Sequence, residues 1–175
     1  AFGYFGHMWE LYTFWAFVPV IIAFHNSFSS TPINVSLWSF LIIAVGGVGC
    51  VLGGYLSVNK GVKEVAFCAL LISGVCCLIS PLILSYASTP AFIAFLMLWG
   101  ITVIPDSPLF STLVASYAEP KTKGTALTIV NCVGFSLTIV SIQLVQYLSL
   151  SIPFYLVFLF LFPGPLFGLI SVLKK

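Results

Sequence analysis

The stretch VSLWSFLIIAVGGVGCVLGGYLSV (residues 35–58) decides the fold class, because it contains no charged side chain. A helix that crosses the hydrocarbon core of a membrane needs roughly 20 predominantly apolar residues. Five further stretches have this character, at about residues 4–24, 65–86, 91–117, 125–148 and 152–173. The sequence therefore predicts an all-α, polytopic membrane protein, with six transmembrane helices in a single bundle over residues 1–175.

The overall composition supports a membrane protein. Hydrophobic residues make up 61% of the chain and charged residues only 6%, whereas a soluble domain carries about 25% charged residues. The mean hydropathy is +1.19. A water-soluble domain is thus excluded, and the lipid bilayer is the chain's predicted surroundings. The net charge of +2 follows from topology, and we expect no nucleic-acid partner.

The basic residues predict the orientation of the helices. All six are lysines, and they lie in the second loop, the fourth loop and the C-terminus: Lys60, Lys63, Lys121, Lys123, Lys174 and Lys175. Loops rich in lysine stay on the cytoplasmic side of a membrane. We therefore expect both termini to be cytoplasmic. The chain begins at Ala1 and enters the membrane almost at once, which fits either a fragment of a longer protein or a processed start.

Two of the four acidic residues fall inside predicted helices. Glu64 and Glu119 lie in loops, whereas Glu10 and Asp106 lie about 9 Å and about 16 Å from the cytoplasmic ends of their helices. A carboxylate at this depth costs a few kcal/mol and is a functional candidate by default. Each of the two needs a water-filled cavity, a partner or a proton, and we expect an aqueous passage to reach both.

The segment GITVIPDSPLF (residues 100–110) predicts a broken helix around one of these acids. Pro105 and Pro108 flank Asp106 and Ser107. Each proline removes an amide donor, and the freed backbone groups must be satisfied by protein or by cavity water. A broken helix with an acid at mid-membrane is the best sequence indication of a transport site. A structural kink around a protonated aspartic acid is the alternative.

His7 and Glu10 are three residues apart and share one face of the first helix. A metal site is disfavoured, because the other histidine, His25, lies near the opposite end of that helix. We predict a hydrogen-bonded pair of His7 and Glu10 near an inner gate. The alternative is that both side chains lie at the interface and extend toward cytoplasmic water.

Small and polar residues mark two more helices. Residues 46–54 contain the small-xxx-small pair Gly49 and Gly53 and a second row of Gly46, Cys50 and Gly54, which allow close helix approach. The helix over 125–148 carries a polar stripe, which indicates either a cavity lining or interhelical hydrogen bonds: Thr128, Asn131, Thr138 and Ser141. The segment FPGPLFG (162–168) should kink the last helix. The cysteines are predicted to be small apolar filler.

Several stretches resemble the C-terminal half, helices seven to twelve, of a major facilitator superfamily transporter. The stretch GGYLSVNKGVKE (53–64) resembles the superfamily loop motif G-x-L-a-D-r-x-G-r through Gly54, Leu56, Ser57 and Gly61, but Val58 replaces its aspartate. Three longer stretches resemble a group of bacterial members: GYFGHMWELYTFW (3–15), DSPLFSTLVA (106–115) and KGTALTIVNCVGFSLTIVSIQLV (123–145). Together these matches cover most of the chain.

The resemblance implies two inverted three-helix repeats, and the first helix of each repeat would line a central cavity. It also implies alternating access in a bacterial inner membrane, together with an N-terminal six-helix half as partner. Asp106, with Ser107 and Asn131 nearby, would bind a proton or a cationic part of a small solute, and Glu10 and His7 would gate or relay protons. Gly54 and Gly61 would still determine the backbone shape of the loop at the gate, without the charged residues of the motif.

Other classes of function fit the sequence less well. The chain has no aspartyl dyad, no H-E-x-x-H and no G-x-S-x-G motif, so we expect no enzyme and no cofactor. A non-transporting sensor or assembly protein built on the same fold is the alternative to a transporter. The sequence does not predict the solute or the direction of coupling.

Overall fold

The computed structural model describes residues 1–174, which are helical apart from short connections. Its helices are α1 (Phe2–Asn26), α2 (Val35–Lys60), α3 (Val62–Tyr86), α4 (Thr89–Thr102), α5 (Asp106–Tyr117), α6 (Lys123–Ser149), α7 (Phe154–Val157), the 3-10 helix η1 (Phe158–Leu161) and α8 (Pro163–Leu173). They form six spans long and apolar enough to cross a membrane, with α4 and α5 together making the fourth and α7 to α8 the sixth. The predicted all-α, six-helix membrane fold is confirmed.

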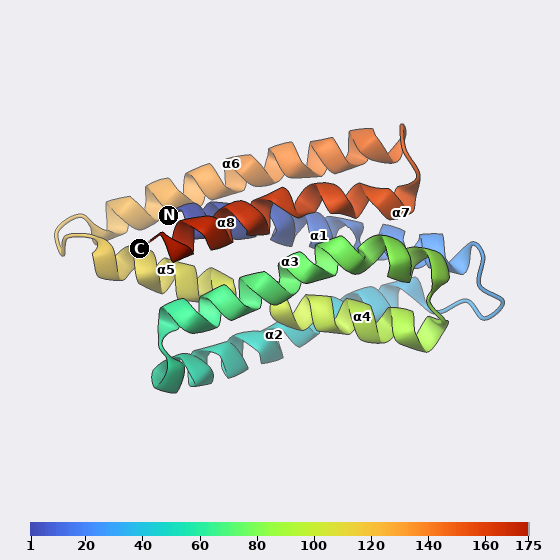
Figure 1. Ribbon diagram of the computed structural model, residues 1–175, viewed down its shortest axis with the longest axis horizontal. Coiled ribbons are helices and arrows are strands. Elements are labelled where there is room, and N and C mark those ends of the chain that lie inside the picture. The colour runs from blue at the N-terminus through green and yellow to red at the C-terminus, as the bar shows by residue number, and fades with distance from the viewer. Residues whose placement is uncertain (175) are drawn as a thin grey trace.

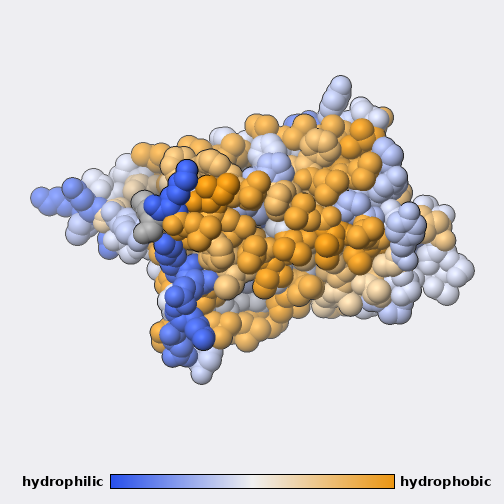
Figure 2. Space-filling model, viewed as in Figure 1, coloured by the Kyte–Doolittle hydropathy of each residue, from blue (hydrophilic) through white to orange (hydrophobic). Residues whose placement is uncertain are grey.

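The spans run back and forth along one axis, so that alternate connections meet at the same end of the bundle (Figure 1). The N-terminus, the C-terminus, the α2–α3 turn and the α5–α6 loop all lie at the left of that view. The hydrophilic residues gather there as well, beside a largely apolar body (Figure 2). We call this the lysine end, after Lys60, Lys63, Lys121, Lys123 and Lys174; Lys175 lies outside the described residues.

The helix contacts have an internal symmetry. Helix α1 packs against α6 and α8, while the α4–α5 span packs against α2 and α3. We divide the chain into two units of three spans, α1–α3 and α4–α8. The first span of each unit, α1 or α4–α5, then packs against the second and third spans of the other unit. Each unit contains three spans, so the two units begin at opposite ends of the bundle. This is the arrangement of two inverted three-helix repeats.

Glycines allow the closest helix crossings. A methyl group on Gly6 of α1 would meet the backbone of α8, at the carbonyl of Gly164 and at the Cα of Gly168, 3.0 Å away. In α2, the glycines that meet α4 and α5 are Gly46, Gly49 and Gly53, whereas Gly54 has no atom within 4 Å of where its Cβ would be. The predicted close approach is therefore confirmed for the pair Gly49 and Gly53 and for Gly46 of the second row, but it is wrong for Gly54. The packing row follows the i, i+3, i+7 spacing of one helix face.

Two local breaks have backbone causes. Gly61 alone separates α2 from α3, and its φ of +95° is a conformation that residues with a Cβ rarely adopt. This backbone requirement explains Gly61, which matches the second glycine of the loop motif. In the last span, the segment 158–161 narrows to a 3-10 helix before α8 begins at Pro163, where a proline is well tolerated.

Candidate functional site

The fourth span is interrupted beside Asp106. Helix α4 ends at Thr102 and α5 begins at Asp106, with Pro105 buried directly before it. The amide of Ser107 donates to the carbonyl of Ile104 at 3.0 Å and closes the turn. Asp106 thus occupies the first position of α5, where the unpaired amide groups of a helix start favour negative charge.

Asp106 is paired with His7 of α1. The His7 Nδ1 lies 2.9 Å from the Asp106 Oδ1, and both side chains are 0% exposed. This separation is that of an ion pair, although the geometry is not that of an aligned hydrogen bond. The remaining polar atoms, His7 Nε2 and Asp106 Oδ2, have no hydrogen-bond partner in the described part of the chain. Buried polar atoms without partners are rare and call for an explanation.

Glu10 occupies a separate and well-satisfied position. Its Oε1 accepts a hydrogen bond from the Trp99 Nε1 at 2.6 Å and a weaker one from the Cys77 Sγ at 3.4 Å. Its Oε2 accepts from the Ser73 Oγ at 2.9 Å. The carboxyl group is 0% exposed. It therefore joins α1 to both α3 and α4 through hydrogen bonds that are strong when the acceptor is charged.

The predicted pairing of His7 with Glu10 is wrong. Both side chains lie on one face of α1, but they contact different partners. The α4–α5 span runs antiparallel to α1 and brings a different residue beside each of them. Trp99 lies seven residues before Asp106, about two helical turns further from the lysine end, so it meets Glu10 while Asp106 meets His7. Glu10 and Asp106 do lie at similar depth, as predicted, to within about one turn of α1.

The expected aqueous passage does not reach the carboxyl groups in this conformation. Both are 0% exposed, and neither lines the two hollows at the lysine end. At Glu10, the hydrogen bonds from Ser73, Cys77 and Trp99 take the place of water. Within residues 1–174, no group of three or more histidine, cysteine, aspartate or glutamate side chains is placed to hold a metal ion.

The other predicted site residues lie outside this cluster. Ser107 is half-buried, and its backbone carbonyl accepts from the Ser111 Oγ at 3.0 Å. Asn131 is half-buried on α6. Pro108 is exposed in the first turn of α5. Gly54 is open to the surroundings on α2. The structure thus brings together His7, Asp106 and Glu10 but not these four.

The polar stripe of α6 divides into two parts. Ser141 and Thr13 of α1 are hydrogen-bonded through their hydroxyls at 2.6 Å, and Thr138 Oγ1 lies 3.4 Å from the carbonyl of Met8. This part of the stripe makes interhelical hydrogen bonds, one of the two alternatives. Thr128, nearer the lysine end, is exposed.

Sequence reasoning missed the three donors to Glu10. Cys77 was predicted to be filler, and neither Ser73 nor Trp99 was singled out. Two signals pointed to them. A buried tryptophan N–H usually finds an acceptor, and acceptors are scarce in a helix bundle this apolar. Ser73 and Cys77 are four residues apart and share one face of α3, which places a hydroxyl donor and a weaker thiol donor side by side.

The hydrogen bond from Trp99 to Glu10 should contribute measurably to stability. We expect Trp99→Phe, which keeps the aromatic ring, to lower the free energy of unfolding by roughly 1.5–3 kcal/mol, the range for a bond to a charged group. Thermal denaturation of the purified protein in detergent measures this. Trp9→Phe is the matched control, because the Trp9 Nε1 donates at 3.1 Å to a neutral acceptor, the Phe160 carbonyl. Equal losses in the two variants would contradict the assignment.

No model of a known protein family matches the chain, and no curated protein matches its sequence. The functional case therefore depends on the chemistry of the buried cluster. The His7 imidazole and the Glu10 carboxyl group lie about one turn apart on α1, and the Asp106 carboxyl group of α5 lies beside the imidazole. Such a series can hold a proton at Asp106, His7 or Glu10 and pass it along the span.

Proposed function

We propose that the chain is one six-helix half of a secondary active transporter of the major facilitator type, which moves a small solute across a bacterial inner membrane by alternating access coupled to protons. The observation that carries this proposal is the sealed His7–Asp106 pair at the break between α4 and α5, with two polar atoms left unpartnered. Such a pair gains partners when water or solute reaches it. Asp106 takes up and releases the proton, and His7 and Glu10 relay it.

The arrangement of the helices supports this proposal. Inverted repeats with a discontinuous helix near the bilayer midplane are typical of secondary transporters. The break lies in the first span of the second repeat, and its counterpart in the first repeat, α1, carries His7 and Glu10. The lysine end would face the cytoplasm, which leaves both termini on that side.

The open face of α6 supports a partner bundle. Of the six spans, α6 has the smallest buried share, and one of its faces exposes three polar side chains: Thr128, Ser136 and Gln143. Thr128 and Ser136 donate to carbonyls of their own helix, whereas lipid tails offer the Gln143 amide no hydrogen bonds and another helix bundle or a water path does. We place the N-terminal six-helix half of the same transporter against this face.

One observation favours a second candidate, a non-transporting sensor or assembly protein. Both oxygens of Glu10 are satisfied by donors within the bundle, which is what a purely structural polar network requires. In such a protein the buried cluster fixes the helix packing and never meets water.

Solute uptake separates the two candidates. The full-length protein is reconstituted into proteoliposomes, and a panel of small solutes is offered with and without an imposed pH gradient. We expect at least one solute to accumulate only when the gradient is present. A folded protein that accumulates none of the panel under either condition would favour the non-transporting candidate.

A further inference from the structure

A hollow of about 350 Å³ opens at the centre of the lysine end. Five helices contribute to its wall, namely the starts of α1, α3 and α6 and the ends of α5 and α8. The lining is mostly apolar, and Lys63 is its one charged side chain. The hollow therefore brings the surrounding water below the ends of the helices on this side of the bundle.

The Phe110 ring lies on the path between this hollow and the His7–Asp106 pair, within a buried apolar cluster that includes Tyr4, Met8 and Leu109. Gly3 and Phe110 both line the hollow. His7 lies one turn further along α1 from Gly3, and Asp106 lies one turn deeper in α5 than Phe110. The Phe110 ring is 3% exposed and fills the space beside Gly3, since a methyl group there would lie 2.5 Å from the ring's Cε1.

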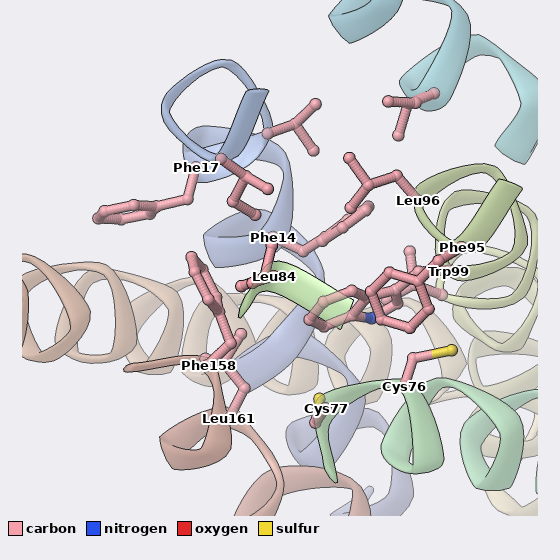
Figure 3. Close-up of a cluster of buried hydrophobic side chains, with 14 of the residues drawn as sticks. Phe14, Phe17, Cys76, Cys77, Leu84, Phe95, Leu96, Trp99, Phe158 and Leu161 are labelled. Atoms are coloured by element: carbon pink, nitrogen blue, oxygen red, sulfur yellow. The ribbon is translucent and has the colours of Figure 1, made fainter. Parts of the chain in front are cut away.

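The barrier on the opposite side of the cluster is much thicker. Beyond Glu10, the Phe14 and Trp99 rings stack with centroids 4.6 Å apart. Phe95 and Phe158 pack around Trp99, and Figure 3 shows these rings with Leu96 and Leu161 in one cluster of buried apolar side chains. This cluster is larger than the one that contains Phe110, and the barrier around the acids is therefore asymmetric.

We infer that, in the conformation of this structure, water and protons reach the His7–Asp106 pair from the lysine end, through this hollow, and that Phe110 is the gate. The inference rests on the proposed proton-coupled function and names its access route. A swing of the Phe110 ring into the hollow exposes Asp106 first, and Glu10 about one turn later along α1. Phe110 contacts neither solute nor proton and acts by positioning.

Carboxyl labelling tests the gate without measuring transport. The full-length protein in lipid vesicles is treated with a membrane-impermeant carbodiimide and glycine ethyl ester. The carboxyl group adds to the carbodiimide as an O-acylisourea, and the amine then forms an amide and releases the urea. Mass spectrometry gives the labelling rate of Asp106 relative to Glu119, which is exposed at the lysine end. We expect Phe110→Ala to raise this ratio about tenfold or more, by lowering the cost of local opening.

Three further comparisons sharpen the test. Gly3→Ala should raise the ratio as well, because its methyl group displaces the Phe110 ring, and it replaces Phe110→Ala if that variant does not fold. Phe92→Ala, which removes a fully buried ring near the other end of the fourth span, should leave the ratio unchanged. Reagent confined to the side opposite the lysines should label Asp106 at the same rate in the wild type, Phe110→Ala and Gly3→Ala.

The access route is overturned if Phe110→Ala or Gly3→Ala leaves the ratio at the wild-type value, if Phe92→Ala raises it equally, or if Phe110→Ala raises the labelling rate from the opposite side to the same extent. These outcomes are distinct from failure of the proposed function. Faster labelling without any solute uptake would retain the gate and remove the transporter. Uptake coupled to protons with unchanged labelling would retain the transporter and remove the gate.

Discussion

Asp106→Asn should abolish solute uptake driven by a pH gradient while leaving the bundle folded. Asparagine has nearly the same shape and still offers an oxygen to the His7 Nδ1, 2.9 Å from Oδ1 in the native protein, but it cannot release a proton. We expect the gradient-driven initial rate to fall by roughly 100-fold or more, a loss typical when a positioned proton carrier is removed. Initial rates in proteoliposomes, with and without the gradient, measure the effect.

The control for this variant is Glu119→Gln, which removes an exposed carboxyl group outside the spans and should leave the rate unchanged. Glu10→Gln should also impair coupling, because its amide keeps an oxygen for Trp99 but carries no exchangeable acid proton. Uptake that remains gradient-driven in both Asp106→Asn and Glu10→Gln would contradict the roles assigned to the two acids. Loss of folded protein in both would favour the structural alternative.

The second large effect is expected at the crossing of α1 and α8. Gly6→Ala should lower the free energy of unfolding by about 1–3 kcal/mol or more, because the added methyl group meets backbone atoms of Gly164 and Gly168 that have no rotamer to change. Since α1 carries His7 and Glu10, a forced separation of these helices should also reduce uptake. Thermal denaturation in detergent gives the change in stability.

Gly47→Ala is the matched control, because a Cβ there has no atom within 4 Å. Alanine favours a helix over glycine by up to about 1 kcal/mol, so this variant should be as stable as the wild type or slightly more stable. If both alanine variants denature at the wild-type temperature, the two helices do not cross as closely as the structure indicates.

The fold was largely predictable from the sequence, because a membrane imposes a simple rule. Uninterrupted apolar stretches such as residues 35–58 must form spans, and alternate lysine-bearing loops fix which ends meet. The helix break was predictable for a related reason, since Pro105 and Pro108 cannot both join a regular helix. These inferences use only properties of one segment at a time.

The partners of the buried side chains were not predictable in the same way. The spacing of His7 and Glu10 shows that they share a face of α1, but it does not show which helix passes that face or at what height. The position of the α4–α5 span along the axis of α1 depends on how the break joins α4 to α5. With the position in this structure, Asp106 meets His7 and Trp99 meets Glu10. Nor does the sequence show that donors on α3 and α4 satisfy Glu10, where a water passage was expected.

The most direct test of the account asks whether the sealed acids communicate with water. Infrared difference spectra of the full-length protein in lipid resolve carboxyl vibrations, and Asp106→Asn and Glu10→Gln assign them. The account predicts that the Asp106 vibration responds when the pH of the water is changed, and responds again when a transported solute is added. A vibration that is the same at every pH at which the protein stays folded, with or without solute, would contradict it.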